Sequence, residues 1–249
     1  MRRLVVPGLL LLLPLTGCSG DDDQQTLTVL AAASLTETFT ELADTFEDEH
    51  PGVEVELVFG SSTTLAEQAV DGAPGDVLAT ADETSMTVAE KGDALGDSPS
   101  SFVSNRLTLI TPTDNPAGID DLDDLDDPAV DYVVCADTAP CGAVAVAVLE
   151  EAGITGPPAS EEVDVKAVLA RVVQGEADAG LVYRTDAVAA GIDVNEVPTA
   201  GADAFATNYF VAPLVGDRAG LAAEFVTLVL SSPARQVFEQ AGFGGTVPE

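Results

Sequence analysis

The stretch "LTVLAAASLTETFTELADTF", residues 27–46, joins an apolar run to an amphipathic segment at a single serine, Ser34. Beyond Ser34, apolar residues recur at steps of four, three and four, which indicates a helix with one buried face. Glu37 follows Ser34 at the spacing of a capping box, so we expect Ser34 to cap this helix. The stretch therefore predicts a strand followed directly by a helix, which is the repeating unit of α/β proteins.

The alternation of strands and helices continues along the chain. "VEVELVF" (53–59) alternates apolar and acidic residues as a half-buried strand does, and "GSSTTLAEQAVDG" (60–72) begins another helix. Further strands are expected in "DVLATAD" (76–82) and "NYFVAPL" (208–214), and a further helix in "CGAVAVAVLEEAG" (141–153). The pattern predicts an α/β chain with mainly parallel sheets, in which ligands bind at the carboxyl ends of strands and against helix N-termini.

The N-terminal segment has the features of an export signal. Two arginines precede an apolar run, residues 4–15, that prolines interrupt and that is too short to span a bilayer. "LTGC" (15–18) resembles the lipobox of bacterial-type lipoproteins, which implies cleavage before Cys18 and lipidation of its sulfur. The alternative is an ordinary thiol after a signal peptide. With residues 19–26 as a solvated tether, we expect an exported protein held by lipid on the outer face of the cytoplasmic membrane.

The chain is strongly acidic. Its formal charge is −34, and loss of Arg2 and Arg3 with the signal leaves 7 basic against 43 acidic residues, or −36. Nucleic acids and anionic lipid surfaces are therefore excluded as partners, since the chain has no basic patch to bind them. An anionic ligand would have to be held by local hydrogen-bond donors rather than by the overall charge.

Two cysteines remain in the exported part, Cys135 and Cys141. An even pair in an exported protein indicates a disulfide, which here would close a short loop. The alternatives are a thiol nucleophile and a metal site. Both lack partners, because His50 is the one histidine of the chain. We therefore expect neither a cofactor nor a protein-bound metal.

At the starts of several predicted helices, directly after a strand, the sequence has small residues that leave backbone N–H groups accessible. These positions are Ser34, the pair Ser61–Ser62, and Cys141–Gly142, and a fourth helix starts at Val165. Helix N-termini present free N–H groups and a positive dipole end, so four such ends meeting at one point would bind an oxyanion through neutral donors. Serines before helices are mostly caps, however, and periodicity alone leaves open whether the four ends meet.

Residues 29–82, "VLAAASLTETFTELADTFEDEHPGVEVELVFGSSTTLAEQAVDGAPGDVLATAD", closely resemble the first lobe of the molybdate-binding proteins of ABC importers. "RLTLITP", "APCG", "EEVDVKAVLARVVQGEADAGLVYRTDA" and "NYFVAPL" match farther along in the same order. The resemblance covers most of residues 26–246 and implies a type II periplasmic-binding-protein fold with a ligand cleft between two lobes. It places residues 27–105 and 207–249 in the first lobe and 106–206 in the second.

The resemblance also implies a function and a set of ligand donors. The protein would capture molybdate or tungstate and deliver it to an ABC permease as a monomer without catalysis, so that molybdenum is present only within the bound anion. The implied donors are hydroxyls and backbone N–H groups of Ser34 and Ser62, the N–H of Val165, the phenol of Tyr183, and the N–H before Gly142, which belongs to Cys141. Cys141 departs from the family, where alanine is common, and a shift in register would replace Ser62 by Ser61.

Three other functions stay open on the sequence. A sulfate- or thiosulfate-binding protein would share the fold, and a ligand-sensing module would share the site. An exported enzyme would use Ser34 or Ser62 as nucleophile, but His50 is expected about 24 Å from Ser34, at the far end of the helix. Arg184 is adjacent to Tyr183 but should point away from it, since neighbouring residues of a strand face opposite sides.

Overall fold

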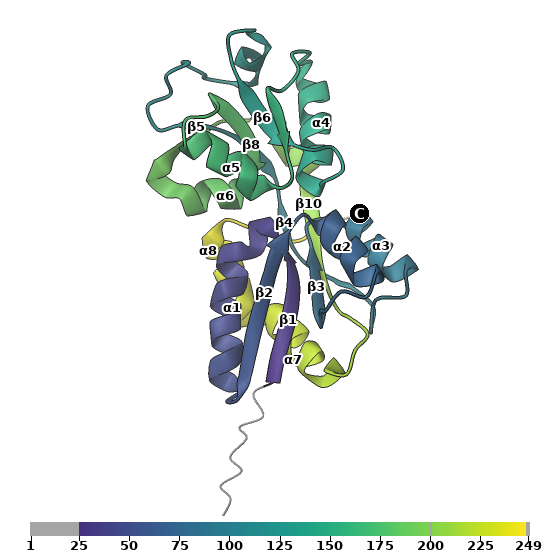
Figure 1. Ribbon diagram of the computed structural model, residues 1–249. Coiled ribbons are helices and arrows are strands. Elements are labelled where there is room, and N and C mark those ends of the chain that lie inside the picture. Colours follow the sequence, from purple (N-terminus) through teal and green to yellow (C-terminus); the bar gives the residue numbers. More distant parts are fainter. Residues whose placement is uncertain (1–24, 200, 248–249) are drawn as a thin grey trace, which may run out of the picture.

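The computed structural model describes residues 25–199 and 201–247 and consists of two lobes, each built on a five-stranded sheet (Figure 1). The expected signal peptide, the lipidation site Cys18 and most of the tether lie outside the described residues. Within the described part, every helix is too short or too polar to cross a bilayer.

The first sheet has the strand order β2-β1-β3-β10-β4. β1 pairs in parallel with β2 and β3, whereas β10 runs antiparallel to β3 and to β4, so four of the five strands point the same way. The sheet is therefore mixed, and β10 is the strand that departs from the expected parallel arrangement. The strands are β1 (Gln25–Ala32), β2 (Val53–Gly60), β3 (Val77–Thr80), β4 (Ser100–Asn105) and β10 (Thr207–Pro213).

The second sheet repeats this plan in the order β7-β6-β8-β5-β9. β6 pairs in parallel with β7 and β8, and β5 runs antiparallel to β8 and β9. In both sheets the reversed strand, β10 or β5, begins where the chain has just passed from the other lobe. The strands are β5 (Leu107–Pro112), β6 (Tyr132–Cys135), β7 (Ser160–Glu162), β8 (Ala179–Tyr183) and β9 (Val194–Val197).

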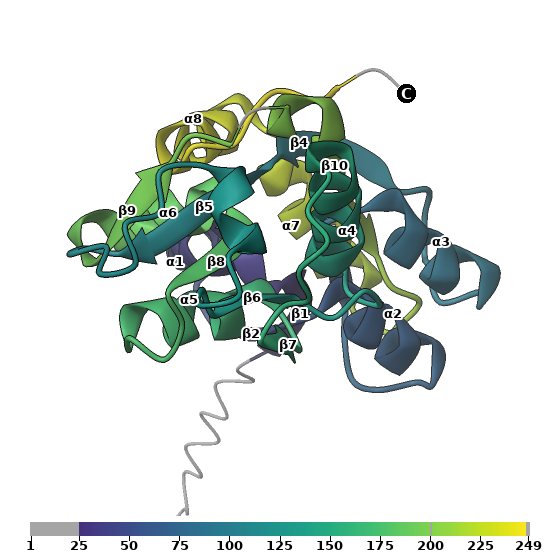
Figure 2. The same cartoon turned by 90° about the horizontal axis from the view of Figure 1, so that it is seen from above.

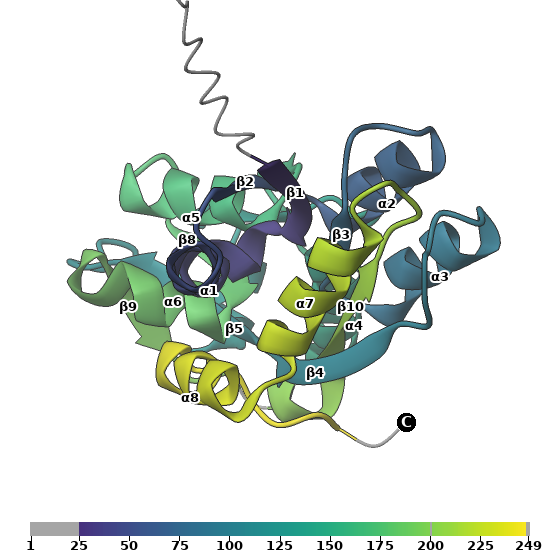
Figure 3. The same cartoon turned by 90° about the horizontal axis from the view of Figure 1, so that it is seen from below.

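Helices cover both sides of each sheet. In the first lobe α1, α7 and α8 lie on one face and α2 and α3 on the other (Figure 3). In the second lobe α4 lies on one side and α5 and α6 on the other (Figure 2). The helices are α1 (Thr36–Glu49), α2 (Ser62–Val70), α3 (Glu83–Lys91), α4 (Pro140–Ala152), α5 (Val165–Val173), α6 (Arg184–Ala190), α7 (Ala219–Val229) and α8 (Ser232–Ala241).

Successive residues of β1 supply the two cores of the first lobe because side chains alternate across a strand. Leu27 and Val29 pack with the phenylalanines of α1, α7 and α8, whereas Leu30 packs with Leu65 of α2 and Met86 of α3. β1 is thus buried on both faces, as its continuous apolar sequence requires. This burial fixes the carboxyl end of β1, where Ser34 follows.

The chain passes between the lobes through two short links. β4 ends at Asn105 in the first sheet and β5 begins at Leu107 in the second, and the return runs from the end of β9 at Val197 to β10 at Thr207. The assignment of whole segments to the lobes, including the C-terminal residues beyond 247, stays a prediction.

The expected capping box at Ser34 is wrong. A 3₁₀ turn (Ala33–Leu35) precedes α1, the N-cap is Leu35, and the cap has no side-chain hydrogen bond. Both side chains of the expected box are used elsewhere, since the Ser34 hydroxyl bonds to Tyr209 and the Glu37 carboxylate to Lys166. The spacing of a capping box is therefore present here without its hydrogen bonds.

Candidate functional site

A small cavity lies between the lobes, at the strand ends and helix starts of both. Its volume, taken as the space open to the centre of a water-sized molecule, is ≈ 20 Å³. All five residues named from the sequence line it, so the structure brings together positions that are up to 149 residues apart. The lining consists of Ala32, Ala33, Ser34, Gly60, Ser61, Ser62, Ala81, Pro140, Cys141, Asp164, Val165 and Tyr183.

Ser62 is the first residue of α2 and is fully buried. Its hydroxyl oxygen accepts a hydrogen bond of 2.9 Å from the backbone N–H of Ala81. Since a hydroxyl has one proton and two lone pairs, this contact leaves the proton of Ser62 free to donate to a second group. Ser62 is thus a candidate donor, and the N-cap of α2 is Ser61.

Ser34 is oriented by residues that the sequence reasoning missed. Its hydroxyl lies 2.7 Å from the hydroxyl of Tyr209 in β10, and the Asn105 amide donates to the same tyrosine oxygen at 3.4 Å. If Tyr209 accepts from Asn105 and donates to Ser34, the proton of Ser34 is available to a ligand. One sequence feature indicates this relay, the chain of hydrogen bonds from Asn105 through Tyr209 to Ser34: polar side chains inside otherwise apolar strand segments.

The first turn of α4 contributes the segment around Cys141. Cys141 is bonded to Cys135 in a disulfide, as expected, and this bond closes the loop that leads into the helix. Gly142 is required here, because a Cβ at this position would lie 1.9 Å from the carbonyl oxygen of Ala136. The disulfide excludes Cys141 as a free thiol nucleophile, and Cys141 is among the residues that line the cavity.

Val165 begins α5 immediately after the N-cap Asp164, whose carboxylate accepts from the N–H of Ala167 at 3.0 Å. The first N–H groups of a helix have no partner within the helix, and the dipole places partial positive charge at this end. The carboxylate of Asp164 is thereby occupied in capping, while the backbone N–H of Val165 remains a candidate donor to a bound anion.

Tyr183 ends β8, and its side chain is buried against the cavity. Its hydroxyl has no hydrogen-bond partner among the described residues. Burial, together with the nearby Asp82, raises the pKa of Tyr183 well above its ordinary value, so the phenol stays protonated. A buried hydroxyl without a partner costs about 1–3 kcal/mol, which a bound acceptor would relieve.

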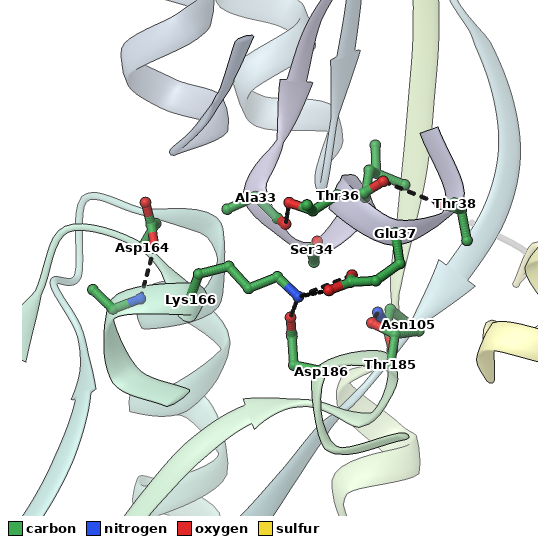
Figure 4. A network of polar contacts seen from close by, with 12 residues as sticks. Ala33, Ser34, Thr36, Glu37, Thr38, Asn105, Asp164, Lys166, Thr185 and Asp186 are labelled. Carbon is green, nitrogen blue, oxygen red and sulfur yellow. Dashed lines mark hydrogen bonds and ion pairs between the residues drawn. The ribbon is translucent and has the colours of Figure 1, made fainter. Parts of the chain in front are cut away.

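The lysine nearest the candidate donors is already paired. No lysine or arginine is among the lining residues, and the cation next to Val165 is Lys166. Figure 4 shows the Lys166 ammonium between two carboxylates, 2.7 Å from Glu37 and 2.9 Å from Asp186. Burial raises the pKa of Asp186 to about 6, against the opposing effect of Lys166.

The histidine that a serine nucleophile would need lies away from the cavity. His50 lies at the opposite end of α1 from Ser34, where its ring bonds to the carboxylate of Glu224 at 2.8 Å and to the carbonyl of Phe46. Among residues 25–199 and 201–247, no three histidine, cysteine, aspartate or glutamate side chains gather as a metal site would require. The arrangement can bind a small anion by hydrogen bonds from neutral groups.

Comparisons with known proteins agree with this geometry. Residues 27–244 match the family model of bacterial extracellular solute-binding proteins. The molybdate-binding protein ModA of Mycobacterium tuberculosis H37Rv is 36% identical over 220 residues, which are 88% of this chain and 84% of that protein.

Two solved structures share the fold. The periplasmic molybdate-binding protein of Azotobacter vinelandii superposes with a TM-score of 0.75 at 23% identity, over 90% of this chain and 100% of that one. The sulfate-binding protein SubI of Mycobacterium tuberculosis H37Rv gives a TM-score of 0.78 at 17% identity, over 90% and 88%. At these identities the two superpositions speak for the fold alone and not for one anion over the other.

Proposed function

We propose that this chain, which belongs to the bacterial extracellular solute-binding proteins, captures molybdate outside the cytoplasmic membrane and delivers it to an ABC permease. The 36% identical relative is named for binding molybdate, and most of both chains take part in the match. We extend the proposal to tungstate, which has nearly the same size and shape. We further propose that the protein works as a monomer, without catalysis, and is anchored through lipidated Cys18.

One observation carries the proposal: five candidate donor residues from two lobes line a single cavity, and no basic side chain is among its lining residues. A tetrahedral dianion presents oxygens in all directions, and donors at about 2.7–3.1 Å satisfy each of them. We assign these contacts to the hydroxyls and N–H groups of Ser34 and Ser62, the N–H groups of Cys141 and Val165, and the hydroxyl of Tyr183.

Size would distinguish molybdate from sulfate. Both are tetrahedral dianions, but sulfate is smaller, so donors fixed at molybdate distances would be stretched around it. The donors are fixed here by contacts behind them, such as the bond from Ala81 to Ser62 and the disulfide at Cys141. Each buried donor left unpaired costs roughly 1–3 kcal/mol, so two stretched contacts are enough for a large preference.

Isothermal titration calorimetry of the exported protein with molybdate, tungstate and sulfate tests the proposal. We expect micromolar or tighter binding of molybdate and tungstate and much weaker binding of sulfate. Tight sulfate binding without molybdate heat would instead establish the sulfate-type alternative.

The assigned donors can be tested in the same assay. Ser62→Ala should weaken molybdate binding by about tenfold or more, because one oriented donor is lost. The matched control is Ser104→Ala, since Ser104 is also buried and its hydroxyl donates to the carbonyl of Gly245 at 2.6 Å, away from the cavity lining. Equal affinities of the two variants would remove Ser62 from the site.

A further inference from the structure

A single lysine joins the two lobes beside the cavity (Figure 4). Lys166 is on α5 of the second lobe, and its ammonium donates to both carboxylate oxygens of Glu37, at 2.7 and 2.9 Å, on α1 of the first lobe. The same ammonium lies 2.9 Å from the carboxylate of Asp186, which belongs to α6 and is completely buried. The lysine side chain is only 25% exposed, so water screens these contacts less than it would on an open surface.

The position of this triad along the sequence relates it to the candidate donors. Each of the three charged residues follows a donor by at most three residues: Glu37 follows Ser34, Lys166 follows Val165, and Asp186 follows Tyr183. A change in the position of any one of the three side chains would therefore displace a segment that carries a donor.

We propose that Lys166 is a positioning residue for the bound anion, and that its ion pair with Glu37 holds the lobes closed around it. This inference rests on the proposed function. Lys166 is not among the residues that line the cavity, and its single positive charge faces two carboxylates. It therefore acts on the ligand through the segments it connects and not as a direct ligand of the anion.

The two halves of the triad differ in what they require of the lobes. Lys166 and Asp186 belong to the same lobe, so their pair is compatible with an open or a closed cleft. The pair of Lys166 with Glu37 crosses between the lobes and forms only when they close. A contact made only in the closed form slows release of the ligand and leaves its association largely unchanged.

A neutral cross-lobe contact lies beside other donors. The Thr63 hydroxyl on α2 donates at 2.8 Å to the carbonyl of Thr138, in the loop that the disulfide closes. Thr63 directly follows Ser62, so this contact also connects a donor-bearing segment of one lobe to the other. The Lys166–Glu37 pair is charged and the Thr63–Thr138 contact is neutral, so the contribution of the ion pair is the one that depends on ionic strength.

Stopped-flow measurement of molybdate binding to Glu37→Ala tests the inference. The chain has no tryptophan, and two of its three tyrosines, Tyr183 and Tyr209, lie at or directly behind the cavity, so tyrosine fluorescence can report binding. We expect dissociation about three- to tenfold faster than in the wild type, with an association rate within about twofold, from the loss of one partly buried, charge-assisted contact.

The matched control is Glu176→Ala. Glu176, which follows α5, pairs at 2.6 Å with Arg171 of that helix, so its removal breaks an ion pair inside the second lobe and none between the lobes. We expect wild-type dissociation from this variant, and we expect urea unfolding without ligand to give similar stabilities for both variants.

Several results would overturn the inference. These are unchanged dissociation from Glu37→Ala, an equal acceleration in Glu176→Ala, or tighter binding by Glu37→Ala, which would mean that the freed lysine binds the anion directly. Failure of the proposed function is distinguishable from all three, because the wild-type protein itself would then show no molybdate binding.

Discussion

Tyr209→Phe isolates the hydroxyl that orients Ser34. Tyr209 is buried in β10, and its oxygen lies 2.7 Å from the Ser34 hydroxyl. Phenylalanine keeps the ring, which packs edge-on against Tyr183 and Phe243 with centroids 5.9 and 5.4 Å away. Asn105 keeps a partner, since its amide also donates to Thr185 at 2.9 Å. The substitution therefore removes the hydrogen bond to Ser34 and the longer one from Asn105 while keeping the packing of the ring.

The expected loss of affinity follows from this bond. Without the tyrosine hydroxyl, the Ser34 hydroxyl loses its fixed orientation and is free to turn away from the anion. A buried neutral hydrogen bond contributes about 0.5–1.5 kcal/mol, and the upper part of that range applies because the bond belongs to a chain of polarised groups. A loss of about 1–1.5 kcal/mol corresponds to a roughly five- to twelvefold higher Kd for molybdate.

Calorimetry with molybdate and urea unfolding without it measure the two consequences separately. The control is Tyr132→Phe, because Tyr132 is also buried and its hydroxyl donates to the carbonyl of Gly156, inside the second lobe. Both variants should lose a similar amount of stability, about 1 kcal/mol, but only Tyr209→Phe should lose affinity. A Kd within twofold of the wild type for Tyr209→Phe would refute the relay from Asn105 through Tyr209 to Ser34.

Two further predictions concern the second lobe. Gly142→Ala should lower both stability and molybdate affinity, because its Cβ would lie 1.9 Å from the carbonyl oxygen of Ala136. The control is Gly220→Ala, which has open space around it and should be neutral or stabilising by up to about 1 kcal/mol. Thermal unfolding compares the stabilities of the two variants, and calorimetry compares their affinities for molybdate. The pKa of Asp186 in the folded protein, about 6, exceeds its ordinary value of 3.8, so the folded state binds this proton more readily than the unfolded state. Urea unfolding at pH 7, 6 and 5 should show the wild type gaining stability relative to Asp186→Asn as the pH falls, by about 1.3 kcal/mol over this range, and a gap that stays constant with pH would contradict this.

The parts of the fold and site that the sequence predicted are those with a local signal. The run from Leu27 to Leu30 is apolar because β1 is buried on both faces, and the periodic segment after Ser34 has one face in the core. Helix starts directly after strands then fix where free N–H groups occur, which is why Ser34, Ser62, Cys141 and Val165 could be singled out from the pattern, whereas Tyr183 was named only from the family resemblance; all five line one cavity. Their role in binding molybdate rests on the family resemblance and stays a prediction.

The parts that the sequence did not predict depend on contacts between distant residues. Ser34 and Tyr209 are 175 residues apart, and Glu37 and Lys166 are 129 apart. The capping-box rule, which considers only neighbours in the sequence, assigned Ser34 and Glu37 to each other. It failed because both side chains bond instead to residues far away in the sequence. Tyr209 itself reads as an ordinary aromatic residue of a strand, and only its hydroxyl is specific to the site.

The acidity of the chain and its selection of an anion are compatible because they act over different distances. Charges on the surface are screened within about 8 Å at physiological ionic strength, so most of the excess negative charge is weak at the cavity. Hydrogen-bond donors within about 3 Å of a bound anion are screened far less, because the five candidate donor residues are buried. A free lysine there would attract sulfate and molybdate alike, since both carry the same charge. Because two carboxylates neutralise Lys166, discrimination between molybdate and sulfate rests on how well each anion fits the fixed donors.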